Sequence, residues 1–206
     1  LTAFLQARDL LLRLRGNPAV AAAEFRWPKI ETFNWALDYF DVMARGNDAT
    51  ALWIVDADDR EHRFSFAELS TRSAQTANFL RAAGVKRGDR MLLLVGNEPA
   101  LWETMLAVIK LGAVMIPATA LLTPDDLRDR LDRGRISHVV ASAALTSKFD
   151  DVAGDYTRIC VGPSQPGWLG LDGARAQPSA FDPLVPTNAD DPLLLYFTSG
   201  TTARPK

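Results

Sequence analysis

The sequence has little of several features that would narrow its function at once. Its 206 residues include one cysteine and two histidines, and the net charge is −2 at pH 7. One cysteine excludes an internal disulfide, which is typical of a reducing compartment, and we therefore expect a cytoplasmic protein. The two histidines, His62 and His138, have no neighbouring cysteine or further histidine. We therefore expect no metal site.

The charge balance and the apolar runs exclude two further classes. A near-neutral chain without a stripe of lysine and arginine lacks the electrostatic footprint of a nucleic-acid-binding protein. No apolar run exceeds five residues, as from Met91 to Val95, so we expect no membrane span. Leu10 to Leu12 could suggest an export signal, but charged residues interrupt the stretch. This pattern predicts an amphipathic helix that ends at Gly16-Asn17-Pro18.

What is present is an ordinary globular composition, 48% hydrophobic and 23% charged, with strand and helix patterns in alternation. A helix at 33–45, a hairpin at 52–66 and a helix capped by Ser65 and Glu68 come first. Strands are predicted at 90–95, 114–117, 137–141 and 157–161, with helices at 98–111, after Thr123 and around 142–150. Short apolar strands framed by helices predict an α/β fold with a largely parallel sheet flanked by helices. Residues 162–191 show no strong periodicity and are interpreted as a connection.

A last predicted strand, 193–197, leads into a run of hydroxyl residues and glycine that ends in lysine. The run consists of Thr198, Ser199, Gly200, Thr201, Thr202, Ala203, Arg204, Pro205 and Lys206. Glycine lets the backbone approach an anion, successive N–H groups and hydroxyls bind it, and lysine adds a positive charge. The run is not a Walker A loop, because Pro205 stands where that motif has glycine. On composition alone, an ordinary Ser/Thr/Gly turn is the alternative.

The order of these residues decides between the two readings. Tyr196 to Lys206 resembles the phosphate-loop signature of the adenylate-forming superfamily, which includes acyl-CoA synthetases, luciferases and peptide-synthetase adenylation domains. That signature reads aromatic-Thr-Ser-Gly-Thr-Thr-Gly-x-Pro-Lys, and only Ala203, in place of the second glycine, departs from its fixed positions. Weaker similarity to the family extends upstream at 64–70, 84–90 and 110–117. Phe33 to Ala36, Gly167 to Leu169 and Tyr196-Phe197 resemble the acetyl/medium-chain acyl-CoA synthetase branch.

The resemblance implies both an organisation and a chemistry. It implies that residues 33–206 are the N-terminal part of an AMP-binding (adenylation) domain, truncated at the phosphate loop, after a helical extension at 1–32. It implies an acid–CoA ligase that uses ATP with Mg²⁺, a carboxylic acid and coenzyme A. Residues 198–206 would hold the ATP phosphates, and no catalytic residue would lie within this chain. The family's adenine segment, acyl pocket, ribose-binding aspartate and mobile lysine follow the phosphate loop, so the 206 residues alone are expected to be inactive.

Two other functions fit the same signature. The chain could belong to an adenylation domain that loads a carrier protein, or to a non-catalytic binding module that kept the fold, with Ala203 as the sign of decay. The remaining conspicuous residues have structural interpretations. The acidic residues between Asp56 and Glu61 predict a solvated turn, and the alternating charges from Asp125 to Arg133 a solvated helix face. Cys160 is expected to be a buried, inert thiol, His138 a satisfied histidine, and the five tryptophans core or domain-contact anchors.

Overall fold

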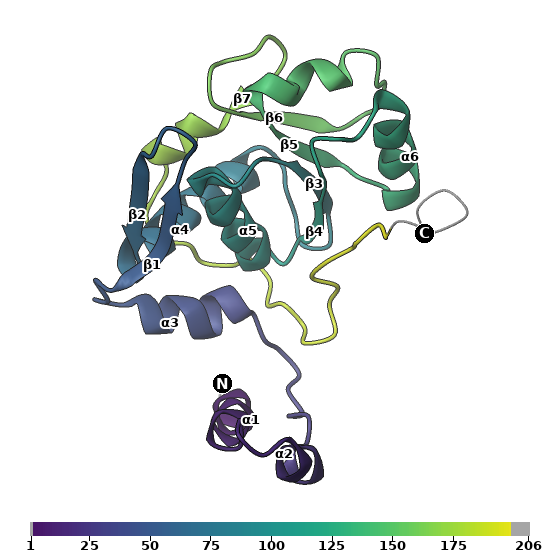
Figure 1. The fold of residues 1–206 in the computed structure, drawn as a ribbon. Coiled ribbons are helices and arrows are strands. Elements are labelled where there is room, and N and C mark those ends of the chain that lie inside the picture. The colour runs from purple at the N-terminus through teal and green to yellow at the C-terminus, as the bar shows by residue number, and fades with distance from the viewer. Residues whose placement is uncertain (1, 199–206) are drawn as a thin grey trace.

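A parallel sheet forms the centre of the protein. The computed structural model describes residues 2–198 (Figure 1). The strands are β3 (Arg90–Leu94), β4 (Val114–Pro117), β5 (His138–Ser142), β6 (Thr157–Val161) and β7 (Leu169–Gly170). Their order is β4-β3-β5-β6-β7, and every neighbouring pair is parallel. The strands predicted at 90–95, 114–117, 137–141 and 157–161 and the predicted fold class are confirmed.

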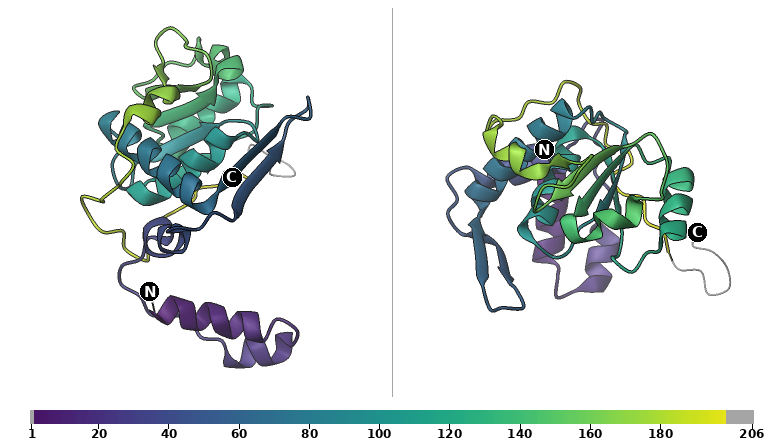
Figure 2. Two further views of the ribbon diagram at one scale, coloured as in Figure 1. Left: turned by 90° about the vertical axis from the view of Figure 1, so that its left-hand side faces the viewer. Right: turned by 90° about the horizontal axis from the view of Figure 1, so that it is seen from above.

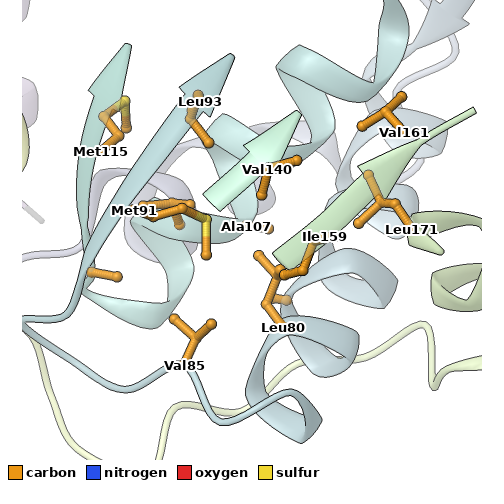
Figure 3. Packing of buried hydrophobic residues seen from close by; sticks show 13 residues of the cluster. Leu80, Val85, Met91, Leu93, Ala107, Met115, Val140, Ile159, Val161 and Leu171 are labelled. Carbon is orange, nitrogen blue, oxygen red and sulfur yellow. The ribbon is translucent and has the colours of Figure 1, made fainter. Parts of the chain in front are cut away.

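Helices cover both faces of the sheet, as the alternation of strands and helices predicts. The first face carries α4 (Phe66–Ala82) and α5 (Pro99–Leu111), and the second carries α6 (Pro124–Gly134) and the 3₁₀ helix Ala143–Phe149. In β3, Met91 and Leu93 belong to the first core, whereas Leu92 and Leu94 belong to the second. Figure 3 shows the first of these cores between the sheet and the helices. Successive side chains of a strand point to opposite faces, so an all-apolar strand has to be covered twice.

A hairpin and a capped helix precede the sheet, and both were predicted correctly. Strands β1 (Thr50–Val55) and β2 (Glu61–Ser65) pair antiparallel. The Ser65 hydroxyl accepts a hydrogen bond from the Glu68 amide at 3.1 Å, and the Glu68 carboxylate accepts one from the Ser65 amide at 2.8 Å. This is the reciprocal pair that satisfies two orphan donors at the start of a helix. In the turn, the Asp56 carboxylate accepts the backbone N–H of Arg60, as expected of a local polar turn.

The N-terminal region differs from the sequence expectation in two places. Pro18, interpreted as the end of one helix, is the first residue of another: α1 (Thr2–Arg13) is followed by α2 (Pro18–Glu24). The Asn17 side chain accepts a hydrogen bond from the Val20 amide at 3.2 Å, and proline is tolerated at the first helical position because it needs no N–H there. The predicted helix at 33–45 is a π-helical segment, Trp35–Phe40, continued by α3 (Asp41–Ala44).

The two N-terminal helices lie to one side of the sheet and its covering helices (Figure 2). Helix α1 contacts the rest of the protein through Phe4, whose ring lies 4.9 Å from that of Phe33, and through Arg8, which donates to the Tyr39 hydroxyl at 2.9 Å. Neither α1 nor α2 has a fully buried residue. Among residues 2–198, no helix combines the length and the apolar character that a membrane crossing requires.

Helix α5 carries two buried charges that join it to other elements. The Lys110 side chain is 0% exposed and donates to both carboxylate oxygens of Asp41, each at 2.7 Å. Glu103 is 1% exposed and forms ion pairs with Arg72 of α4 and with Arg175, which lies in the 3₁₀ helix Leu171–Ala176. Sequence periodicity gave no sign of either centre. The 3₁₀ helix and the short strand β7 also interrupt the connection that was expected to be irregular.

Two expectations about aromatic and imidazole side chains need correction. None of the five tryptophans is buried, and Trp27 is 86% exposed. Two of them still contact core residues: the ring of Trp168 lies 5.5 Å from that of Phe149, and the ring of Trp35 lies 5.7 Å from that of Phe40. The interpretation of His138 is half correct, because Nε2 lies 3.1 Å from Asp89 whereas the buried Nδ1 has no hydrogen-bond partner in the described part of the chain. Cys160 is buried, as expected, and burial raises the pKa of its thiol.

Candidate functional site

The structure describes the entrance to the predicted phosphate loop. Thr198 is exposed and ends the described part of the chain. The other eight predicted site residues lie outside it: Ser199, Gly200, Thr201, Thr202, Ala203, Arg204, Pro205 and Lys206. The site can therefore be built from the segment 193–198, here called the stem, and from the elements that hold it.

The stem lies beside β4 and runs parallel to it. The Met115 amide donates to the Leu193 carbonyl, and the Leu195 amide donates to the Met115 carbonyl, both at 3.0 Å. These two bonds make a single bridge between Met115 and Leu194, so the predicted strand 193–197 is wrong in extent. The physical reason lies in β4. The next donor in a parallel ladder would be residue 117, which is proline and has no N–H.

This pairing determines where the loop begins. Because the stem is parallel to β4 and Leu194 pairs with Met115, Phe197 and Thr198 continue past the carboxyl end of that strand. The strands β3 and β5 end at the same edge, since all three are parallel. In open parallel sheets, ligands bind outside the carboxyl ends of the strands. The fold therefore brings Thr198, the first residue of the hydroxyl- and glycine-rich run, to the edge where such sheets hold ligands.

A cavity of about 260 Å³ lies at the C-terminal end of the stem. Its lining consists of Pro117, Ala118, Thr119, Arg130, Tyr196 and Phe197. The Arg130 guanidinium lies 5.3 Å from the centre of the Phe197 ring, and that of Arg133 lies 5.6 Å from it. A guanidinium within about 6 Å of a ring centre is in the range of a cation–π contact. The cavity thus combines a hydroxyl group, a positive charge and an aromatic face.

Sequence reasoning missed Arg130, because it placed the charges of 125–133 on a solvated helix face. That interpretation holds for Arg128 and Asp132, which are exposed, but the Arg130 side chain is only 11% exposed. The missed signal was spacing. Arg130 stands three residues after Leu127 and four before Gly134, both buried, so it lies on their side of the helix.

A second polar group occupies the same edge of the sheet. The chain passes from β3 to β4 on one side and then to β5 on the other, so its winding reverses next to β3. There the Ser142 hydroxyl donates to the Glu98 carboxylate at 2.8 Å, and the Trp102 indole donates to the Asn97 side chain at 3.1 Å. In each pair the donor and the acceptor satisfy one another. The bond between Ser142 and Glu98 joins the end of β5 to the segment that follows β3.

A larger cavity, about 430 Å³, lies elsewhere and does not belong to this site. Its lining includes Val85 and Lys86, which precede β3, so it opens at the amino edge of the sheet. Its other walls are mostly apolar, among them Leu111, Phe181 and Leu184. Its positive side chains, Arg81, Lys86 and Arg87, lie at the edge of the sheet opposite to the one that the stem reaches. Within residues 2–198, no group of three or more His, Cys, Asp or Glu side chains could hold a metal ion.

Comparison with known proteins agrees with the geometry. The family described as AMP-binding enzyme matches residues 40–206. Human mitochondrial acyl-coenzyme A synthetase ACSM5 is 36% identical over 188 residues, covering 85% of this chain and 32% of that protein. Among solved structures, an acyl-CoA synthetase of Brucella canis has a TM-score of 0.79 at 24% identity, covering 97% of this chain and 36% of that one. A benzoate CoA ligase of Burkholderia xenovorans has a TM-score of 0.68 at 26% identity, covering 80% and 32%.

The expected cytoplasmic location is wrong on this comparison. The human, rat and mouse ACSM5 proteins, which are 34–36% identical to the chain, are all mitochondrial by name. The expectation rested on a single cysteine, and a cysteine count separates only reducing from oxidising compartments.

The comparisons also show what share of its relatives' length the chain covers. The chain spans about a third of the length of the curated relatives it matches. The family match covers most of the chain and includes both the stem and the loop. The sheet, the position of the stem and the signature that follows it agree with that match. The chain belongs to the AMP-binding, adenylate-forming enzyme family, and its relatives in that family include the acyl-CoA synthetases of the ACSM group.

Proposed function

We propose that these residues form part of an ATP-dependent acid–CoA ligase. The observation that carries the proposal is the stem, which brings Thr198, the first residue of the signature 198–206, to the carboxyl edge of a parallel sheet. In the first step, an oxygen of the substrate carboxylate attacks the α-phosphorus of Mg²⁺-bound ATP, and pyrophosphate leaves. In the second step, the thiol of coenzyme A attacks the acyl carbon and loses its proton, and AMP leaves with the carboxylate oxygen that had bonded to phosphorus.

The proposed role of residues 198–206 belongs to the first step. Backbone N–H groups and hydroxyls around Gly200 would bind the β- and γ-phosphates, and Lys206 would offset the negative charge that builds on the departing pyrophosphate. This is a positioning and electrostatic role, and it needs no proton transfer by the loop. We also propose that residues 1–32 form an extension and that 33–206 are the N-terminal part of the adenylation domain.

We propose a carboxylic acid and the thiol of coenzyme A as the two co-substrates of ATP. The names of the relatives support a carboxylic acid substrate and coenzyme A: one is an acyl-coenzyme A synthetase, another a benzoate CoA ligase. A phosphopantetheine thiol on a carrier protein presents the same nucleophile. A non-catalytic module would bind nucleotide without turnover.

Acid-dependent exchange of labelled pyrophosphate into ATP tests the proposal. We expect exchange by the full-length polypeptide with at least one acid among acetate, octanoate and benzoate, and none without acid. Residues 1–206 alone should show none, because the adenine, ribose and acyl sites lie elsewhere in the family. Thioester formation with coenzyme A, compared with a carrier protein, then identifies the acceptor. Absence of exchange by the full-length polypeptide with any acid, or exchange by the 206 residues alone, would refute this account.

A further inference from the structure

The contact between α6 and the stem suggests a role for two arginines that the mechanism above does not use. Phe197 is the last apolar residue before the phosphate loop, and it packs against the second core cluster. Its ring also lies within 6 Å of the guanidinium groups of Arg130 and Arg133, which are nearly one turn apart on α6. One aromatic side chain is thus held by the core and by two cations.

Both arginines are held in place from their own helix. The Arg130 guanidinium donates to the Asp126 carbonyl at 3.3 Å, and the Arg133 guanidinium donates to the Asp129 carboxylate at 3.1 Å. These contacts restrict where the cations can move. Because the Arg130 side chain is nearly buried, its contact with the ring is partly shielded from water. Cation–π contacts are stronger when they are shielded in this way.

We propose that Arg130 and Arg133 are positioning residues for the phosphate loop, acting through Phe197. The inference rests on the proposed function. The stem has only two backbone bonds to β4, because Pro117 ends the ladder. Phe197 and its two cations therefore fix the chain at the point where the loop starts. A loop anchored at its start loses less conformational freedom on binding a triphosphate, so its affinity for ATP is higher.

The test uses the full-length polypeptide. Its substitutions separate the effect of the aromatic face from that of apolar volume, and the effect of the positive charge from that of the aliphatic chain. Phe197→Leu keeps an apolar side chain but removes the aromatic face, whereas Phe197→Tyr keeps the face. Arg130→Met keeps most of the aliphatic length and removes the charge. Initial rates of acid-dependent turnover are measured while MgATP and the acid are varied separately, and thermal unfolding is followed for each variant.

We expect Phe197→Leu and Arg130→Met each to raise the KM for MgATP about 3- to 10-fold and to leave the KM for the acid unchanged. Phe197→Tyr should behave like the wild type. In the Phe197→Leu background, Arg130→Met should add little, because the two changes remove one contact.

Three results would overturn the inference. The first is an unchanged KM for MgATP in both single variants. The second is an equal rise in both KM values, which indicates general damage. The third is full additivity of the two changes, which indicates that Arg130 acts without the ring. A wild type without exchange activity removes the proposed function and this inference together. That result is distinguished from the other three because it is seen before any substitution is made.

Discussion

Replacement of Lys110 by alanine is expected to lower the free energy of unfolding by about 3 kcal/mol, at the lower end of the range for broken buried ion pairs. For a chain of this length, that loss corresponds to a fall in Tm of about 6 to 12 °C. Lys110 is fully buried, and its ammonium group donates to both oxygens of Asp41 and to the Ser70 carbonyl. Its removal leaves the Asp41 carboxylate, itself only partly exposed, without its cation.

The environment of Lys110 explains why removing one partner of the ion pair is costly. Desolvation lowers the pKa of Lys110, and the charge and hydrogen bonds of Asp41 oppose that shift. The pair therefore costs desolvation energy while it is intact and costs more once one partner is removed. It joins the start of α3 to the end of α5, two segments whose sequence spacing gave no sign of contact.

Two further variants separate charge from packing. Lys110→Met keeps most of the buried aliphatic volume, so the difference between methionine and alanine measures packing. Lys110→Met combined with Asp41→Leu removes both charges, and we expect this double variant to be more stable than Lys110→Met alone. Urea denaturation of all three variants measures the effect. A loss below about 1 kcal/mol for Lys110→Ala, or a double variant less stable than Lys110→Met, would show that the pair is not what holds these segments together.

Replacement of Lys206 by alanine is expected to slow acyl-adenylate formation about 10- to 150-fold, the equivalent of losing a charge-assisted contact of roughly 1.5–3 kcal/mol. The second half-reaction, started from preformed acyl-adenylate and coenzyme A, should be nearly unchanged, because no triphosphate is then present. Single-turnover rates of both half-reactions in the full-length polypeptide measure this difference.

Ala203→Gly is the matched control within the same loop. If the family's glycine at this position provides backbone freedom, the change should be tolerated or should lower the KM for ATP, since an L-residue held at positive φ costs roughly 1–2 kcal/mol. Equal slowing of both half-reactions by Lys206→Ala would instead indicate that the loop has only a structural role.

The parallel sheet could be predicted from the sequence because its strands are short, apolar and separated by capped helices. Ser65 and Thr123 marked two helix starts through side chains that bond the backbone three residues on. The phosphate loop is predicted from its order of residues, and the family match includes that segment. Each of these features is local in sequence, which is why a single sequence was sufficient.

The misses depend on contacts between distant residues or on a competing local rule. The limited extent of the stem depends on Pro117 in a strand some 80 residues earlier. The contact of Arg130 with Phe197 joins residues more than 60 positions apart, and charge patterning favoured a solvated face over the spacing that places Arg130 beside buried residues. The helix α2 was missed because proline was interpreted as a stop, although it also starts helices.

The fate of the carboxylate oxygens tests the central proposal most directly. If the full-length polypeptide joins an acid to coenzyme A through an acyl-adenylate, an acid labelled with oxygen-18 in both carboxylate positions must transfer one labelled oxygen to AMP. The other oxygen must stay in the carbonyl of the thioester, and pyrophosphate must carry no label. Mass spectrometry of the AMP formed during turnover measures this transfer. Unlabelled AMP alongside thioester, or label in inorganic phosphate, would show that the acid is not activated at the α-phosphate and would contradict the account.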